Sequence, residues 1–193
     1  MYEVHVTLEG LADFLYNRMT PEDLEAFRGG QTGGTLTDAQ RKEAAEKRLY
    51  VDKEGCYLPE WTTKRVLLEG ARWGKLKLGK KPLDRILAAV AFVQEPSRFM
   101  RGGKPIKLRD YLREDIGRTP PKKGVCTIVR RPALKAGWQL MIRLMVLDDV
   151  IPDKAIKEAF EMAGMYVGVG AWRPEFGRFI VRSFTTKRGT GKE

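Results

Sequence analysis

Apolar and polar residues alternate with a period of two at the start of the chain. Every second side chain in residues 2–8 is apolar, which is typical of a strand with one face against a core. That face consists of Tyr2, Val4, Val6 and Leu8. The segment 20–23 then has the form of a brief capped helix start, with proline at the first helical position. We therefore expect a first strand followed by a short helix.

Glycines punctuate the next part of the chain. Residues 29–35 interrupt regular structure and indicate a loop. Thr37 and Gln40 form a capping box, which predicts a polar surface helix to about Arg48. Two short apolar runs, 49–51 and 56–58, flank a turn that ends in glycine, and so predict a hairpin.

A helix is expected from Pro59 to about Trp73. Its core-facing stripe has helical spacing and comprises Val66, Leu67, Gly70 and Ala71. The apolar run 86–93 fits either a buried strand or a buried helix, and Pro96 soon after it favours a strand. Residues 98–123 are basic and broken by glycine and proline, with a short helix predicted at 108–116. This segment fits either an inserted finger or a plain linker.

The last third of the chain has the clearest pattern. Segments 125–129 and 139–146 are rich in β-formers, and a turn at 132–137 predicts that they pair antiparallel. Pro152 begins a helix whose apolar face comprises Ile156, Ala159, Phe160, Ala163 and Val167. A final strand is expected at 178–184, and the polar residues after it are expected to fray.

The resulting order of elements is β, α, β, β, α, β. This order predicts a single α+β domain over residues 1–193 with a ferredoxin-like (RRM-like) core. Insertions are expected at about 14–48 and 95–124, and a flexible tail at 186–193. Many nucleic-acid binders use the open sheet face of this fold, but the fold alone establishes no function.

Composition narrows the class of protein. The 193 residues, 42% of them hydrophobic, fit one domain, and no run approaches a membrane span. The first residues lack the pattern of a signal peptide, so we expect a cytoplasmic protein with no membrane partner. Cys56 and Cys126 are widely separated and there is one histidine, so the cysteines are expected to be reduced and structural. No metal or other cofactor is expected.

The charge of the chain points to a polyanion. Lys and Arg number 36 against 25 Asp and Glu, which leaves a net charge of +11 and a pI near 9.7. The basic residues gather in segments 64–81, 98–107 and 118–131. Such segregation favours a nucleic-acid face, and a solvated basic surface is the alternative.

The segment 167–179, VGVGAWRPEFGRF, combines glycines, arginines and aromatics between the last helix and the last strand. Its glycines can bring backbone amides to phosphates, or can serve as helix cap and turn. Arg173 and Arg178 can fork onto phosphates, or pair with Glu175. Trp172 can stack on an unpaired base or cover the core, whereas Phe176 and Phe179 are expected in the core.

Basic residues elsewhere extend the candidate interface. Arg130 and Arg131 end one predicted strand and Arg143 lies on the next, which predicts a basic stripe across the sheet, a solvated edge being the alternative. The candidate nucleic-acid-binding residues are Arg28, Lys64, Arg65, Lys75, Lys77, Arg101, Lys104, Arg130, Arg131, Arg143, Gly168, Gly170, Trp172, Arg173 and Arg178.

The glycine loop resembles a family signature. Gly168 and Gly170, with Gly177, Arg178 and Phe179 before the last strand, are similar to the signature of the RAMP superfamily of CRISPR-associated RNA-binding proteins. The chain looks most like their backbone subunits, which coat a guide RNA, and is also similar to uncharacterised proteins of tailed phages and prophages that end in a comparable motif. The resemblance implies RNA binding by repeated subunits, as a filament or ring, in host cytoplasm if the chain is phage-encoded.

Catalysis is the second hypothesis, because some RAMP proteins cleave RNA with a histidine. His5 is the weak catalytic candidate, since it lies on the polar side of the first strand. A lone strand histidine is more commonly structural, and no other catalytic motif is present. The sequence therefore favours non-enzymatic binding of single-stranded nucleic acid, RNA or DNA. Alternatives are an endoribonuclease and a phage assembly or anti-defence protein that acts through protein contacts.

Overall fold

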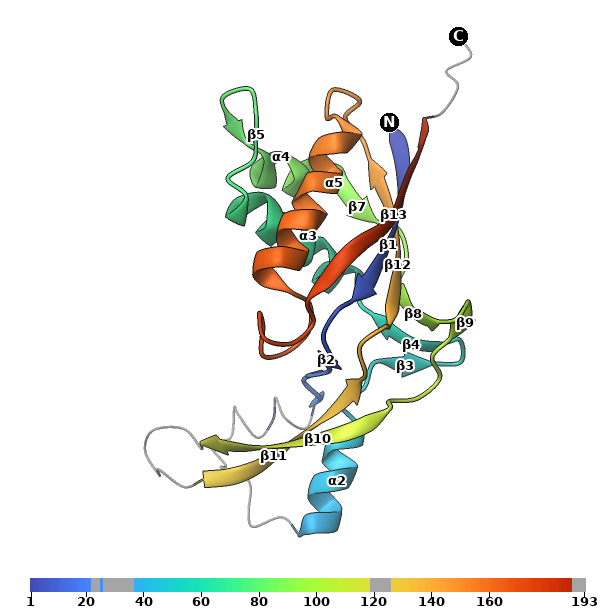
Figure 1. Ribbon diagram of the computed structural model, residues 1–193, viewed down its shortest axis with the longest axis vertical. Helices are drawn as coiled ribbons and strands as arrows, with labels where there is room; N and C mark the ends of the chain where they lie inside the picture. Colours follow the sequence, from blue (N-terminus) through green and yellow to red (C-terminus); the bar gives the residue numbers. More distant parts are fainter. Residues whose placement is uncertain (22–24, 26–36, 119–125, 189–193) are drawn as a thin grey trace.

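Strand β1 (Tyr2–Gly10) lies between two strands from the other end of the chain. In the computed structural model, which describes residues 1–21, 25, 37–118 and 126–188, β1 pairs antiparallel with β12 (Gln139–Val146) and with β13 (Phe179–Arg188). Side chains of β1 alternate between buried and half-buried, as the period of two predicts. The predicted first and last strands are therefore confirmed (Figure 1).

The large sheet continues beyond β12. Its strand order is β13-β1-β12-β8-β4-β3, with β7 also paired to β12 and β9 to β8. These strands are β3 (Val51–Asp52), β4 (Gly55–Leu58), β7 (Ala91–Val93), β8 (Ser97–Arg101) and β9 (Lys104–Pro105). The hairpin predicted around residues 49–58 is confirmed by the pairing of β3 with β4.

Helices pack on one face of this sheet, and the other face is uncovered in Figure 1. They are α3 (Glu60–Trp73), α4 (Leu83–Val90), α5 (Asp153–Met162) and the π-helical turn η1 (Ala163–Val167), with a small hairpin of β5 (Lys77–Leu78) and β6 (Lys81–Pro82) between α3 and α4. A Cβ at Gly70 would lie 2.0 Å from the Ala159 carbonyl oxygen, so glycine is required where α3 crosses α5. We call the large sheet with these helices the body.

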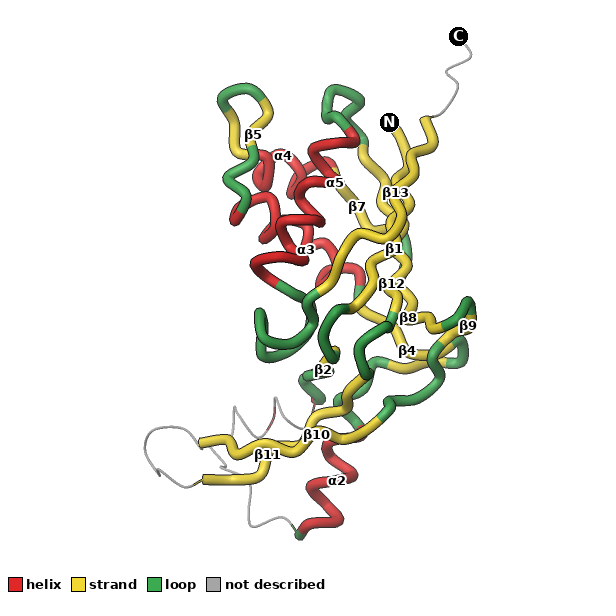
Figure 2. The backbone as a smooth tube through the Cα atoms, in the orientation of Figure 1, coloured by secondary structure: helices red, strands yellow, loops and turns green. Residues whose placement is uncertain are grey.

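A second, smaller sheet extends away from the body. It has the order β10-β11-β2 and comprises β2 (Phe14–Leu15), β10 (Tyr111–Arg118) and β11 (Cys126–Leu134). Helix α2 (Asp38–Glu46), which begins at the predicted capping box, packs beside it, as Figure 2 shows. We call β2, β10, β11 and α2 the hairpin lobe.

The predicted helices at Pro59 and Pro152 are confirmed by α3 and α5. Each apolar stripe named in the sequence is buried in the structure. The helix start predicted at 20–23 lies mostly outside the described residues, as do the loop at 29–35 and Arg28. Among the described residues, no helix is long and apolar enough to cross a membrane.

Three predictions of local structure are wrong. Residues 83–90 form helix α4, because Leu83 and Leu87 are buried one turn apart and the alanines that follow them favour helix, so that only 91–93 of the predicted strand is extended, as β7. Residues 111–118 form a strand and not a helix, because pairing with β11 overrides local propensity. Strand β13 continues to Arg188, so the expected tail is paired with β1 as far as that residue.

The predicted pairing of 125–129 with 139–146 is also wrong. Strand β11 pairs with β10 and β2 in the small sheet, whereas β12 pairs with β1, β7 and β8 in the large sheet. The two strands are consecutive in sequence and β-rich, but they belong to different sheets. A β-rich segment gives no information on its partner, which is set by long-range packing.

Candidate nucleic-acid interface

The glycine loop after η1 closes onto the segment that follows β1. The amide of Ala171 donates to the Leu15 carbonyl oxygen at 2.9 Å, and that of Gly177 to the Asp13 carbonyl oxygen at 2.8 Å. In the other direction, the amide of Leu11 donates to the Arg178 carbonyl oxygen at 2.8 Å. These bonds hold the loop between the body and the hairpin lobe.

The loop glycines are required by close packing. Gly168, Gly170 and Gly177 have φ values of +73°, +91° and +71°, a region that favours glycine. A Cβ on Gly170 would lie 2.7 Å from the Leu15 carbonyl oxygen. A Cβ on Gly177 would lie only 1.7 Å from the Val169 carbonyl oxygen. The amide of Gly168 caps η1 by donating to the Ala163 carbonyl oxygen at 2.8 Å. The cap and turn alternative therefore accounts for the conformation of Gly168 and Gly170.

The loop aromatics contact arginines of the hairpin lobe. The Arg131 guanidinium lies 4.1 Å from the centroid of the Trp172 ring. The Arg113 guanidinium lies 4.6 Å from the centroid of the Phe176 ring. Trp172 is 38% exposed and has φ of +52°, a strained value for a bulky residue, which these contacts offset. Phe176 is half-buried, whereas Phe179 is in the core as expected.

Arg131 lies half-buried on β11 of the hairpin lobe. Burial lowers its pKa, and the nearby charge of Arg48 lowers it further. Its Nε and Nη1 atoms are buried and have no hydrogen-bond partner among the described residues. A buried guanidinium without hydrogen-bond partners is stabilised by an anion that binds next to it.

Arg173 and Arg65 converge on one carboxylate. Arg173 Nη1 donates to Glu69 Oε2 at 2.7 Å, and Arg65 Nε donates to Glu69 Oε1 at 2.7 Å. Burial raises the pKa of Glu69, but the two arginines outweigh it and hold that pKa below its usual range. The predicted pairing of Arg173 with Glu175 is replaced by this contact. Two positive charges therefore share one negative charge on α3.

Arg178 instead anchors the ends of the loop. Its Nε donates to the Pro174 carbonyl oxygen at 2.9 Å and its Nη1 to that of Met165 at 2.8 Å, while the side chain remains exposed. Both acceptors are neutral, so the full charge of the guanidinium is available to an anion.

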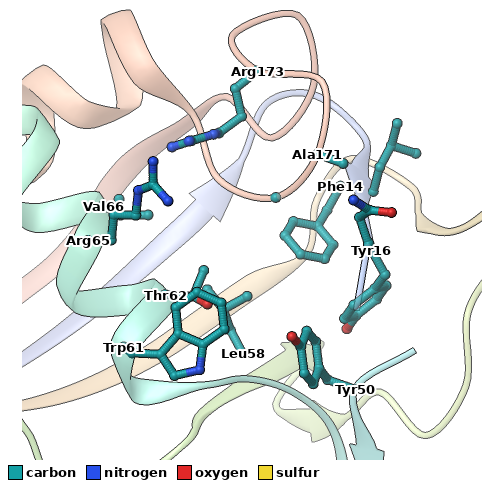
Figure 3. Close-up of a pocket in the computed structure, with 13 residues that line it drawn as sticks. Phe14, Tyr16, Tyr50, Leu58, Trp61, Thr62, Arg65, Val66, Ala171 and Arg173 are labelled. Carbon is teal, nitrogen blue, oxygen red and sulfur yellow. The ribbon is translucent and has the colours of Figure 1, made fainter. Parts of the chain in front are cut away.

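A cleft opens between the loop, β2 and the first turns of α3. Trp61 and Tyr50 lie on one side of it, and the guanidinium groups of Arg65 and Arg173 lie together on the other (Figure 3). The full lining is Phe14, Leu15, Tyr16, Asn17, Tyr50, Leu58, Trp61, Thr62, Arg65, Val66, Gly170, Ala171 and Arg173. The cleft thus combines aromatic walls with a cationic rim.

Several predicted binding arginines are occupied by carboxylates elsewhere. Arg101 donates through both terminal nitrogens to Asp110 at 2.8 Å. Arg130 is buried and pairs with Asp38 and Glu114. These two arginines connect elements of the fold.

The predicted basic stripe across one sheet is not formed. Arg143 lies on β12 in the large sheet, where it pairs with Glu3 at 2.9 Å and Glu95 at 3.4 Å, whereas Arg130 and Arg131 lie on β11 in the small sheet. The stripe depended on the pairing of these two strands, and they do not pair. The open face around Arg143 is therefore balanced in charge.

The predicted lysines are dispersed. Lys64 donates to the Ala88 carbonyl oxygen at 2.8 Å and lies over the Phe92 ring, while Lys75 and Lys77 are exposed on the α3–β6 connection. Lys104 is exposed at the start of β9. The structure brings Arg65 and Arg173 together at Glu69, and Arg131 together with Trp172 of the glycine loop. Gly168, Gly170 and Arg178 belong to the same loop, and the other described candidates lie apart.

His5 lies on the half-buried side of β1, opposite the apolar set. Its Nε2 is 3.3 Å from Glu3 Oε1, and its strand partners are Arg143 and Thr185. In the part of the chain that the structure describes, no group of three or more His, Cys, Asp or Glu residues is placed to hold a metal ion. His5 stays the weak catalytic candidate, and binding without catalysis stays a prediction.

Sequence reasoning missed the aromatic side of the cleft. Trp61 is 63% exposed in the first turn of α3, and Arg65 follows it one turn later on the same face. A signal was available, because both residues fall outside the apolar stripe of that helix. Tyr16 and Tyr50 gave no comparable signal, since they come from segments without clear periodicity.

The comparisons with known proteins concern the fold. No protein-family model matches the sequence, and no curated protein matches it. A chain from the cryo-EM structure of the type III-B Cmr-beta bound to cognate target RNA is similar, with 14% identity and a TM-score of 0.53. The similarity covers 96% of this chain and 60% of that chain, so the protein spans less than two thirds of its neighbour's length.

The crystal structure of Thermofilum pendens Csc2 is also found, with 8% identity, a TM-score of 0.35, and coverage of 96% of this chain and 66% of that one. The similarity to the Cmr-beta chain shows fold alone. It supports a mixed α+β fold with a large antiparallel sheet. The sequence-level family and the link to phages stay predictions.

Proposed function

We propose that this protein binds single-stranded RNA, without cleaving it, along the cleft and the glycine loop. The observation that carries the proposal is the convergence of Arg65 and Arg173 at the rim of a cleft that is also lined by the exposed Trp61. Trp172, the residue before Arg173 in the glycine loop, adds a second exposed ring, which lies against Arg131. Guanidinium groups bind phosphates and aromatic rings stack on unpaired bases, which are the two contacts that single strands require.

The fold supports RNA as the ligand. Four strands of the large sheet have the order β13-β1-β12-β7. Helix α3 lies in the connection from β1 to β7, and α5 lies in the connection from β12 to β13. This arrangement fits a ferredoxin-like core. The Cmr-beta chain of similar fold was determined bound to target RNA, which favours RNA over DNA as the first ligand to test.

Glu69 is a competitor of the phosphate in this proposal. It holds Arg65 and Arg173 in position while no anion is present, and a phosphate can replace it on either guanidinium. The net charge of +11 draws a polyanion toward the protein. Salt-dependent binding follows from both features.

The test is fluorescence anisotropy with labelled 20-nucleotide oligo(U) and oligo(dT) at several salt concentrations. Wild-type protein is expected to bind oligo(U) and to lose affinity as salt rises. Arg173→Ala is expected to weaken binding about tenfold and to reduce the salt slope by about 0.7. Glu69→Gln is expected to strengthen it several-fold, because it removes the competing charge.

Lys77→Ala is the matched control, since it removes one positive charge from an exposed hairpin away from the cleft. Equal losses in Arg173→Ala and Lys77→Ala would show that only net charge matters. The same incubations, analysed on a gel, test the proposed absence of cleavage. The number of proteins bound to RNAs of increasing length tests the predicted repetition of subunits along a strand.

A further inference from the structure

Two hydroxyl groups in the cleft lack hydrogen-bond partners among the described residues. Tyr16 is 1% exposed and its Oη is unpaired, and so is Oγ1 of Thr62. Burial raises the pKa of the Tyr16 hydroxyl, and the nearby Cys56 thiol, whose sulfur is only a weak hydrogen-bonding partner, raises it further. Buried polar atoms without partners are rare and costly. They indicate that a neutral polar ligand completes the site.

Aromatic rings give the cleft its shape. Tyr16 packs edge-on against Phe14 inside it, and Tyr50 and Trp61 form the outer wall in Figure 3. The exposed ring of Trp61 has no ring partner among the described residues, whereas Trp73, the other exposed tryptophan of α3, stacks on Tyr166. A flat ligand is the shape that these rings accept.

The opposite rim of the cleft is cationic. Arg65 and Arg173 reach it from α3 and from the glycine loop, and their guanidinium groups lie together around Glu69 (Figure 3). A ligand that fills the cleft therefore has a flat, neutral, polar part against the aromatic side and an anionic part at the rim. A nucleotide has both parts in one molecule.

We infer that the cleft binds one unstacked nucleotide of the RNA, with its base among Tyr16, Tyr50 and Trp61 and its phosphate at Arg65 and Arg173. This inference rests on the proposed function and adds a discrete pocket for a single base to it. Hydroxyl groups donate or accept as required, so the pocket accepts different bases with modest preference.

The experiment compares two exposed tryptophans of the same helix. Trp61→Ala is expected to weaken oligo(U) binding about five- to hundredfold, the loss for one stacked base. Trp73→Ala removes an equally exposed ring outside the cleft and is expected to leave affinity unchanged. Thermal unfolding followed by circular dichroism verifies that both variants are folded.

A second variant separates binding from structure. Tyr16→Phe keeps the ring and removes the unpaired hydroxyl, so the free protein is expected to be as stable as the wild type or more stable, while RNA affinity falls about threefold or more. A purely structural role for this residue predicts lower stability and unchanged affinity. RNA with one 5-iodouridine is expected to cross-link to Trp61 or Tyr50.

The outcomes distinguish the inference from the proposed function. If wild-type protein binds RNA and Arg173→Ala weakens it, while Trp61→Ala and Trp73→Ala both bind normally, the base pocket is wrong and the proposed function stands. If wild-type protein binds no RNA at low salt, both are wrong. Cross-links confined to the open sheet face would also overturn the pocket.

Discussion

The body and the hairpin lobe are held together by different forces. The body has a continuous apolar core, in which Leu8, Leu140, Leu144 and Phe160 are among the residues with almost no exposure. In the lobe, buried apolar side chains lie in β2 and at the end of β11, whereas helix α2 buries only Ala45 and none of residues 111–116 is fully buried. The hydrophobic effect therefore stabilises the body, and it contributes much less to the stability of the lobe.

Ion pairs join the parts of the lobe that bury few apolar side chains. Arg130 joins β11 to α2 and β10 through Asp38 and Glu114. Arg109 pairs with Glu46 of α2, and Arg101 of the body pairs with Asp110 at the start of the lobe. Exposed pairs are individually weak and respond to salt and pH. We therefore expect the lobe to open more readily than the body, and the cleft lies where the two meet.

The largest expected effect is from a core substitution in the body. Leu144→Ala removes a fully buried side chain from β12 and is expected to lower the free energy of unfolding by about 2–5 kcal/mol. Urea denaturation measures it. Ile116→Ala in the lobe is the control, because Ile116 is 80% exposed and its loss is expected to change stability by no more than about 0.5 kcal/mol. Similar losses in both would contradict the contrast between the regions.

An intermediate effect is expected from the carboxylate that joins the two regions. Asp110→Asn weakens the paired hydrogen bonds from Arg101, and the protection of β10 and β11 against hydrogen exchange is expected to fall by about 1–2 kcal/mol. Protection of β1 and β12 is expected to remain. Glu161→Gln, which removes an exposed pair within α5, is the control. A uniform loss across both sheets would show that the lobe does not open separately.

The smallest effect is expected from mild acid. Hydrogen bonds from Arg130 and Arg101 hold the pKa values of Asp38 and Asp110 below their usual range. Because these pKa values are lower in the folded state, their stabilisation is complete above about pH 4 and is lost as pH falls through the folded values. Lobe protection, corrected for intrinsic exchange, should be level from pH 7 to 5 and fall before that of the body below pH 4. Loss at pH 6 would exclude these carboxylates as the cause.

The sequence predicted the elements that bury one regular face. β1, α3, α5 and β13 all follow from periodicity, because a core imposes its period directly on the chain. Helix α4 was missed because a short apolar run carries no period of its own. The partner of β11 was missed because strand pairing depends on segments far away in sequence.

The candidate site was predictable in position and less so in detail. The three glycines of the segment 167–179 predicted the loop. Its Arg173 lines the cleft, and Trp172 and Arg178 belong to the same loop. Sequence could not show that Arg143 and Arg101 face carboxylates, because those contacts depend on which strands are neighbours. The aromatic side of the cleft combines Tyr16, Tyr50 and Trp61, which only the folded chain brings together.

The position of β1 between β12 and β13 has a consequence for how the protein folds. Tyr2 pairs with Val146 on one side and with Arg188 on the other, so β1 has no partner on either edge until the last third of the sequence is made. Contacts between residues so far apart in sequence make folding slow. Until then its apolar face is exposed to aggregation, and the glycine loop, which closes onto the segment after β1, is completed at the same late stage.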